Sequence, residues 1–153
     1  IKIWFMPTGW RPTDVIKNYP LNYIKNPNSQ IKYKTSNSSL SLSWIWIQFV
    51  IAGFFMFHLF TIISDYSIVM YYLYSIFIFI HIFSFTSSLD NKFYAIIADV
   101  LKLTLGVGLL QYQNYTWFGL HQFFSIIFII YFLLSIFITA YLYKLNKIIK
   151  VAS

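Results

Sequence analysis

Three histidines, His58, His81 and His121, are the residues of this 153-residue sequence best suited to metal binding or proton transfer. None has another His, a Cys or a carboxylate three or four positions away, so the sequence contains no local pair of metal ligands. At about 1.5 Å per helical residue, His58 and His121 are expected at a similar distance from one end of the helical bundle. His81 is expected much further from that end. A haem held between His58 and His121 is geometrically permitted. The simpler interpretation is that each histidine hydrogen-bonds to a neighbouring helix or lies near the membrane interface.

A pair of opposite charges, Asp99 and Lys102, lies within the otherwise apolar segment 93–112. The spacing of three places both side chains on one helix face, and Gly106 continues the same stripe. In lipid each charge costs about 2.5–3.5 kcal/mol at the helix centre, whereas a surface ion pair returns at most about 1 kcal/mol. We therefore expect a buried polar pair that faces other helices, another domain or water.

No other arrangement of residues indicates catalysis. The sequence has no Ser-His-Asp order, no phosphate-binding loop and no paired carboxylates, and the lack of cysteine excludes disulfides and thiolate metal sites. We therefore assign no catalytic, cofactor-binding or metal-binding residue to this chain.

The composition indicates a protein that is dissolved in lipid. Hydrophobic residues make up 59% of the chain and charged residues 10%, where soluble domains carry about 25%. The net charge of +7 does not indicate nucleic-acid binding, because the basic residues flank the apolar segments. That placement is typical of the cytoplasmic ends of membrane helices.

We expect an all-α fold, a multi-pass transmembrane bundle of about four helices behind an irregular Pro/Trp-rich segment. Each apolar segment is long enough to cross the roughly 30 Å hydrocarbon core, or nearly so. The expected helices are 41–63, 67–85, 93–112 and 117–145. Ser41 or Ser43 is expected to cap the first helix. Trp117 at one end of the fourth helix, with Tyr141 and Tyr143 at the other, is expected to lie in the interfacial belts.

The domain organisation follows from charge and proline. Residues 1–40 contain all four prolines and form a cytoplasmic or interfacial linker loop, residues 41–145 form the helical domain, and 146–153 form a basic tail. Six basic residues against one acid precede residue 40, and three lysines lie at the end. The short connections 64–66 and 113–116 contain no Lys or Arg. Both termini are therefore predicted to be cytoplasmic.

Trp10 and Arg11 stand in the rigid loop Met6–Thr13, which has two prolines and a glycine. The structural interpretation is an interfacial turn in which Trp10 lies at the lipid headgroups and Arg11 pairs with phosphate. A share in a substrate entrance and docking to another subunit are the alternatives.

The segment FMPTGWRPTDVIKNYP resembles the region that follows the catalytic core in the sterol desaturase/fatty acid hydroxylase superfamily, especially in alkylglycerol monooxygenase-like members. There a "GPGWRP"-type turn precedes a Pro-containing linker and a block of apolar helices. The later stretch FTSSLDNKFYAIIADVLKL is similar to a second family pattern. Leu89 and Asp90 match it, Asp99 stands where Glu is common, and Lys102 stands near a common Arg.

The resemblance implies that this chain is the C-terminal, membrane-anchoring portion of a di-iron, oxygen-dependent lipid hydroxylase or desaturase. Ile1 is then not a biological start, and the family's histidine boxes lie upstream of it. The chain itself departs from the family pattern because it contains no histidine box, so no catalytic role is carried over. The implied partners are membrane lipids and the histidine-box domain of the same protein.

The alternative is a small non-catalytic membrane subunit of a larger respiratory or secretion complex. Its support is the small size and the absence of an active-site arrangement in the sequence.

Overall fold

The computed structural model describes residues 5–7, 10–20, 35 and 37–152. The chain divides into two compact units, residues 1–33 and residues 34–153. In the first unit, the described residues form one short helix, α1 (Thr13–Asn18). Most of the expected linker, including Thr8, Gly9 and residues 21–34, lies outside the described residues.

The second unit is built from four long helices and, in its described part, has no strand. They are α2 (Ser39–Thr61), α3 (Ile68–Leu89), α4 (Tyr94–Tyr112) and α5 (Gln122–Ala152). All four are long and apolar enough to cross a membrane. The expected all-α fold with four transmembrane helices is therefore confirmed.

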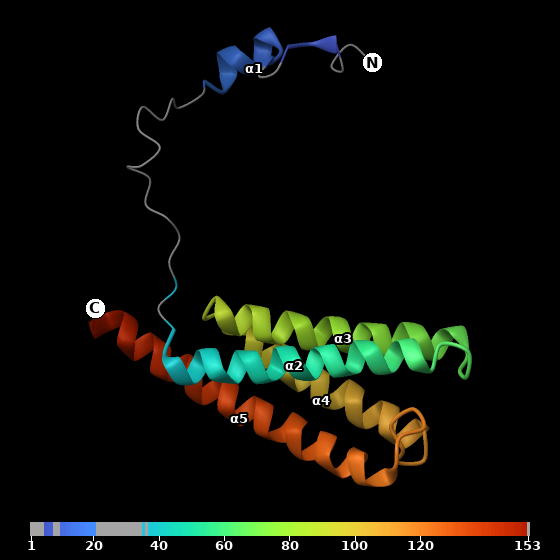
Figure 1. Ribbon diagram of the computed structural model, residues 1–153. Helices are drawn as coiled ribbons and strands as arrows, with labels where there is room; N and C mark the ends of the chain where they lie inside the picture. The colour runs from blue at the N-terminus through green and yellow to red at the C-terminus, as the bar shows by residue number, and fades with distance from the viewer. Residues whose placement is uncertain (1–4, 8–9, 21–34, 36, 153) are drawn as a thin grey trace. The chain divides into compact units, whose positions relative to one another are not determined.

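Consecutive helices run antiparallel to each other, because the connections between them are short (Figure 1). α3 packs against both α2 and α4, and α4 packs against α5. The start of α2 and the last turns of α5 meet at one end, where the Ser38 amide donates to Asn146 Oδ1 at 3.0 Å. We call this the asparagine end, after Asn37, Asn91 and Asn146. The other end, formed by connections 62–67 and 113–121, is the two-loop end.

The starts of α2 and α5 differ from the expectation by more than one residue, and α3 ends at Leu89 instead of residue 85. Ser38 caps α2, because its hydroxyl accepts the Ser41 amide at 3.2 Å. Ser41 and Ser43 both lie inside α2, so neither is its cap, and the buried Ser41 hydroxyl accepts a hydrogen bond from Asn146. α5 begins at Gln122, not at residue 117, and continues to Ala152 through most of the expected tail 146–153.

Trp117 was expected in an interfacial belt, and that expectation is wrong. Its side chain is fully buried, in the connection that precedes α5. The ring lies 4.9 Å from Phe77 and 5.4 Å from Phe55, measured between centroids. Its one polar atom, Nε1, donates to the Tyr74 hydroxyl at 3.0 Å. Burial is favourable here because the indole finds both aromatic packing and a hydrogen-bond acceptor.

The core is aromatic near the two-loop end and polar near the asparagine end. Phe55, Tyr74, Phe77, Trp117 and Phe132 are fully buried in one cluster. Large apolar side chains also cover the outside of the bundle, for example Phe57, Phe79 and Phe137. Helices that are apolar all round are stable where lipid replaces water as the solvent.

Candidate functional site: a buried ion pair in the bundle

The ion pair Asp99–Lys102 lies on the inward face of α4. Both side chains have no exposed surface, and Lys102 Nζ lies 2.6 Å from Asp99 Oδ1. The structure thus brings together the two charged residues singled out by their spacing in the sequence, and it turns them toward protein.

Hydroxyl groups from the neighbouring helices surround this pair, and two of them hydrogen-bond to it. Ser84 of α3 donates to Asp99 Oδ1, and Thr139 of α5 also faces this carboxylate. Lys102 Nζ donates to the Ser135 hydroxyl of α5 at 2.7 Å. A buried ion pair is tolerated when further hydrogen bonds replace lost hydration. The pair therefore ties α3, α4 and α5 together.

A second polar layer lies beside the pair. Lys102 Nζ is 5.2 Å from the centroid of the Tyr131 ring, close enough for a cation–π interaction. The Tyr131 ring also lies 5.9 Å from His81 and 6.1 Å from Trp44. This layer joins all four helices, since the backbone carbonyl of Gln48 on α2 bonds to His81 Nε2 at 3.0 Å.

Several atoms of this second layer have no hydrogen-bond partner among the described residues. They are Trp44 Nε1, both side-chain polar atoms of Gln48, His81 Nδ1 and the Tyr131 hydroxyl. Gln48 and His81 are fully buried. Unpaired buried polar groups cost about 1–3 kcal/mol each, so these atoms lower the stability of the layer.

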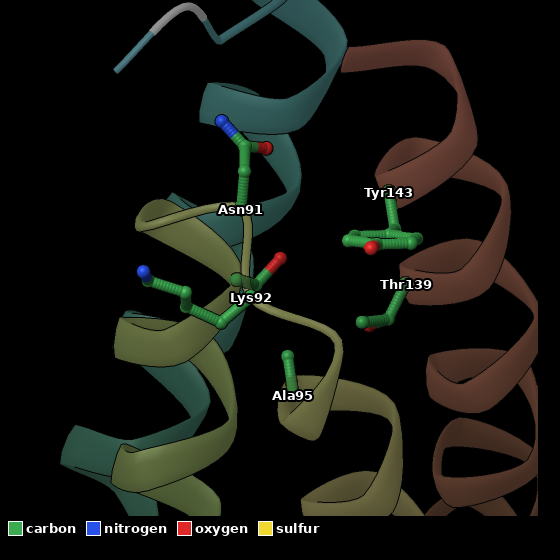
Figure 2. Close-up of a pocket in the computed structure, with 6 residues that line it drawn as sticks. Asn91, Lys92, Ala95, Thr139 and Tyr143 are labelled. Atoms are coloured by element: carbon green, nitrogen blue, oxygen red, sulfur yellow. The ribbon is translucent and has the colours of Figure 1, made fainter. Parts of the chain in front are cut away.

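The asparagine end closes the polar interior. Asn146 donates to the side-chain oxygens of Asn91 at 2.6 Å and of Ser41 at 3.2 Å. Figure 2 shows Thr139 and Tyr143 projecting from α5 toward the α3–α4 connection that carries Asn91. The recess between them is too small for a water molecule. The ion pair is therefore shielded from the aqueous phase at this end.

The three histidines occupy three different environments. His58 Nδ1 lies 3.0 Å from the Tyr74 hydroxyl near the two-loop end, and His81 is buried in the second polar layer. His121 is exposed, and its Nδ1 accepts the Phe123 amide at 3.2 Å. In the described part of the chain, no group of three or more His, Asp or Glu side chains is arranged to hold a metal ion. These residues therefore do not fit a di-iron centre, and we assign them no redox step.

Trp10 and Arg11 lie in the first unit, beside α1. Arg11 Nη2 donates to the Tyr19 carbonyl at 2.8 Å, which bonds the segment before α1 to the residue after it. The Trp10 side chain is exposed, and its amide donates to the Pro7 carbonyl at 3.0 Å. The role of this loop at lipid headgroups stays a prediction.

Sequence reasoning missed the hydroxyl and amide partners of the ion pair. A signal exists in α5, whose buried residues follow one another in alternating steps of three and four. They are Ser125, Phe128, Phe132, Ser135, Thr139, Leu142 and Asn146. Four of the seven are polar, and a polar stripe inside an apolar helix indicates an interhelical network.

The chain matches no family model, no curated protein and no solved structure. The four spanning helices, with a buried ion pair at their centre, define a multi-pass integral membrane protein.

Proposed function

We propose that this chain is the membrane-anchoring portion of a di-iron, oxygen-dependent lipid hydroxylase or desaturase of the sterol desaturase/fatty acid hydroxylase type. The proposal rests on the two resembling patches of sequence, which stand in the family order. The observation that carries it is the ion pair. In the second patch Asp99 stands where the family commonly has Glu, and Lys102 stands near a common Arg. In this chain the two residues form a buried ion pair inside the bundle.

The task we assign to this chain is to hold a rigid bundle in the membrane. Charges inside a transmembrane segment usually mark a substrate or ion pathway. Here both charged groups are fully buried and hydrogen-bonded to serines of two other helices, and Asn146 with its partners closes the near end. A network of this kind favours one arrangement of helices over others. In this proposal the oxidation chemistry belongs to a histidine-box domain upstream of Ile1.

We further propose that the asparagine end faces the cytoplasm. Lys92, Lys144 and Lys147 are exposed near this end, whereas connections 62–67 and 113–121 have no Lys or Arg. By the positive-inside rule, this distribution of basic residues favours a cytoplasmic asparagine end. A histidine-box domain preceding Ile1 then lies on the cytoplasmic side as well.

The gene itself tests the proposal. We expect the reading frame to continue upstream of the Ile1 codon and to encode histidine boxes of the HxxxH and HxxHH kinds. The full-length product is expected to purify with two iron ions and to lose them when box histidines are replaced. A start codon next to Ile1, or an upstream frame without histidine boxes, contradicts the proposal and favours the non-catalytic subunit. A haem absorption spectrum that disappears in His58→Ala and His121→Ala indicates an electron carrier instead.

A further inference from the structure

A groove of about 470 Å³ lies at the two-loop end, on the opposite side of the bundle from the asparagine end. It is formed where α2 ends and the connection 113–121 crosses beside the α2–α3 turn. Its lining includes His58, Asp65, Tyr66, Phe118 and Gly119. Since α2 ends at Thr61 and α3 begins at Ile68, we expect the groove at the level of the lipid headgroups.

The groove carries a single formal charge. Asp65 is the only Asp, Glu, Lys or Arg in the sequence of the two connections. Its carboxylate is exposed and accepts a hydrogen bond from the Ser64 hydroxyl at 3.1 Å. This end of the bundle therefore attracts a cation.

His58 supplies a hydrogen-bond donor of defined orientation. Trp117 Nε1 can only donate, so the Tyr74 oxygen accepts that bond at 3.0 Å. The Tyr74 proton is then directed to His58 Nδ1, also at 3.0 Å. This assignment places the proton of neutral His58 on Nε2, as a donor to an anion.

The partly exposed ring of Tyr66 forms an aromatic wall of the groove, and the buried Phe118 ring packs behind it. Tyr66 and Phe118 lie 5.3 Å apart, edge to face, and Tyr74 stacks on Phe118 at 4.5 Å. Burial and then the Asp65 carboxylate raise the pKa of the Tyr66 phenol, so it remains neutral. An aromatic ring beside a carboxylate, as Tyr66 is beside Asp65, is suited to an alkylammonium group.

The backbone of the groove depends on glycine at one position. Gly119 has φ +83°, and a Cβ there would lie 3.5 Å from the Tyr66 hydroxyl. Phe118 also has positive φ, at 45°, and its side chain is nonetheless buried. The packed rings of Trp117 and Phe118 thus hold the connection in a conformation that it does not prefer.

We propose that this groove binds the headgroup of a zwitterionic phospholipid in the leaflet at the two-loop end. Asp65 and the aromatic wall receive the ammonium group, and His58 Nε2–H donates to the phosphate. The acyl chains lie along the apolar outer surface of the bundle. This site is independent of the proposed oxygenase function, which concerns the opposite end.

Lipid retention tests the site. The purified chain is exchanged into mixed vesicles of phosphatidylethanolamine and phosphatidylglycerol, extracted in mild detergent, and its bound lipid is counted by native mass spectrometry. We expect the chain to retain phosphatidylethanolamine about tenfold better than phosphatidylglycerol. A difference in affinity of this size corresponds to one charge-assisted contact. Asp65→Asn is expected to abolish this preference.

The matched control is Asp90→Asn, which removes an exposed carboxylate at the asparagine end. It is expected to leave the preference unchanged. Equal retention of the two lipids by the unmodified chain, or an unchanged preference in Asp65→Asn, overturns the proposal. Glycerophosphoethanolamine, which lacks acyl chains, should compete weakly. Competition as strong as that of the lipid identifies a soluble amine as the ligand and also overturns it.

Discussion

At the scale of single residues, the ion pair determines which face of α4 is turned toward the other helices. A carboxylate and an ammonium lose their hydration in the membrane, and their mutual attraction alone does not offset that loss. Ser84 and Ser135 add one hydrogen bond each, from α3 and α5. The pair is therefore stable only inside the assembled bundle.

Removing one member of the pair tests this dependence. Lys102→Met leaves Asp99 charged and buried, so the free energy of unfolding should fall by about 3–5 kcal/mol. The double variant Asp99→Asn/Lys102→Met leaves no unpaired charge and should be milder. Thermal unfolding of the purified chain in detergent measures both. An unchanged midpoint in Lys102→Met contradicts burial of the pair.

Replacing Gln48 is expected to have the opposite effect on stability to replacing Lys102. Both polar atoms of its fully buried amide have no partner among the described residues. Gln48→Leu has a similar volume and removes both, so the free energy of unfolding should stay constant or rise by about 1 kcal/mol. Ser135→Ala is the comparison, since it removes a made hydrogen bond and should be destabilising. A loss above about 2 kcal/mol in Gln48→Leu indicates that the amide binds water or a ligand.

At the scale of the elements, α4 and α5 approach closely at one glycine. A Cβ at Gly106 would lie 2.6 Å from Cε2 of the buried Phe132 ring, which is closer than real contacts allow. Gly108 is one half-turn away, and nothing lies within 4 Å of its Cβ position. The contact between α4 and α5 therefore depends on a small residue at Gly106 and not at Gly108.

This contrast provides a matched pair of variants. Gly106→Ala should lower the free energy of unfolding by about 1–3 kcal/mol, because the packed Phe132 ring must move. Gly108→Ala should be neutral or stabilising by up to about 1 kcal/mol, since alanine favours the helix. Both are measured by chemical denaturation in detergent. Equal effects of the two substitutions contradict the packing described for Gly106.

At the scale of the whole molecule, α5 is longer than the hydrocarbon core is thick. α5 has 31 residues and is about 46 Å long, which exceeds the roughly 30 Å hydrocarbon core. Its last turns, with Lys144 and Lys147 exposed, therefore extend beyond the core at the asparagine end.

Cysteine labelling checks the topology, because the natural sequence contains no cysteine. Lys92→Cys lies in the α3–α4 connection and Ser64→Cys in the α2–α3 connection, and both positions are exposed. We expect a membrane-impermeant maleimide to reach Ser64→Cys from outside intact cells and Lys92→Cys only after lysis. Labelling of both from the same side excludes four membrane spans, and the reverse pattern excludes a cytoplasmic asparagine end.

The sequence by itself determined the membrane helices and the pairing of Asp99 with Lys102. Both depend on local properties, namely the apolar composition of each segment and a spacing of three along one helix. The termini of the helices were less predictable, since Ser38 and several serines after it are all suitable caps.

Only the tertiary structure decided what surrounds these residues. Ser84 and Ser135 lie 15 and 33 positions from their partners, and a serine in an apolar helix carries no mark of the side chain it will meet. The surroundings of Trp117 were likewise not evident from the sequence. A tryptophan at the end of an apolar segment is typical of the membrane–water interface. The burial of Trp117 depends on Tyr74 being placed across the bundle to accept its N–H, and the packing of one helix against another determines that placement.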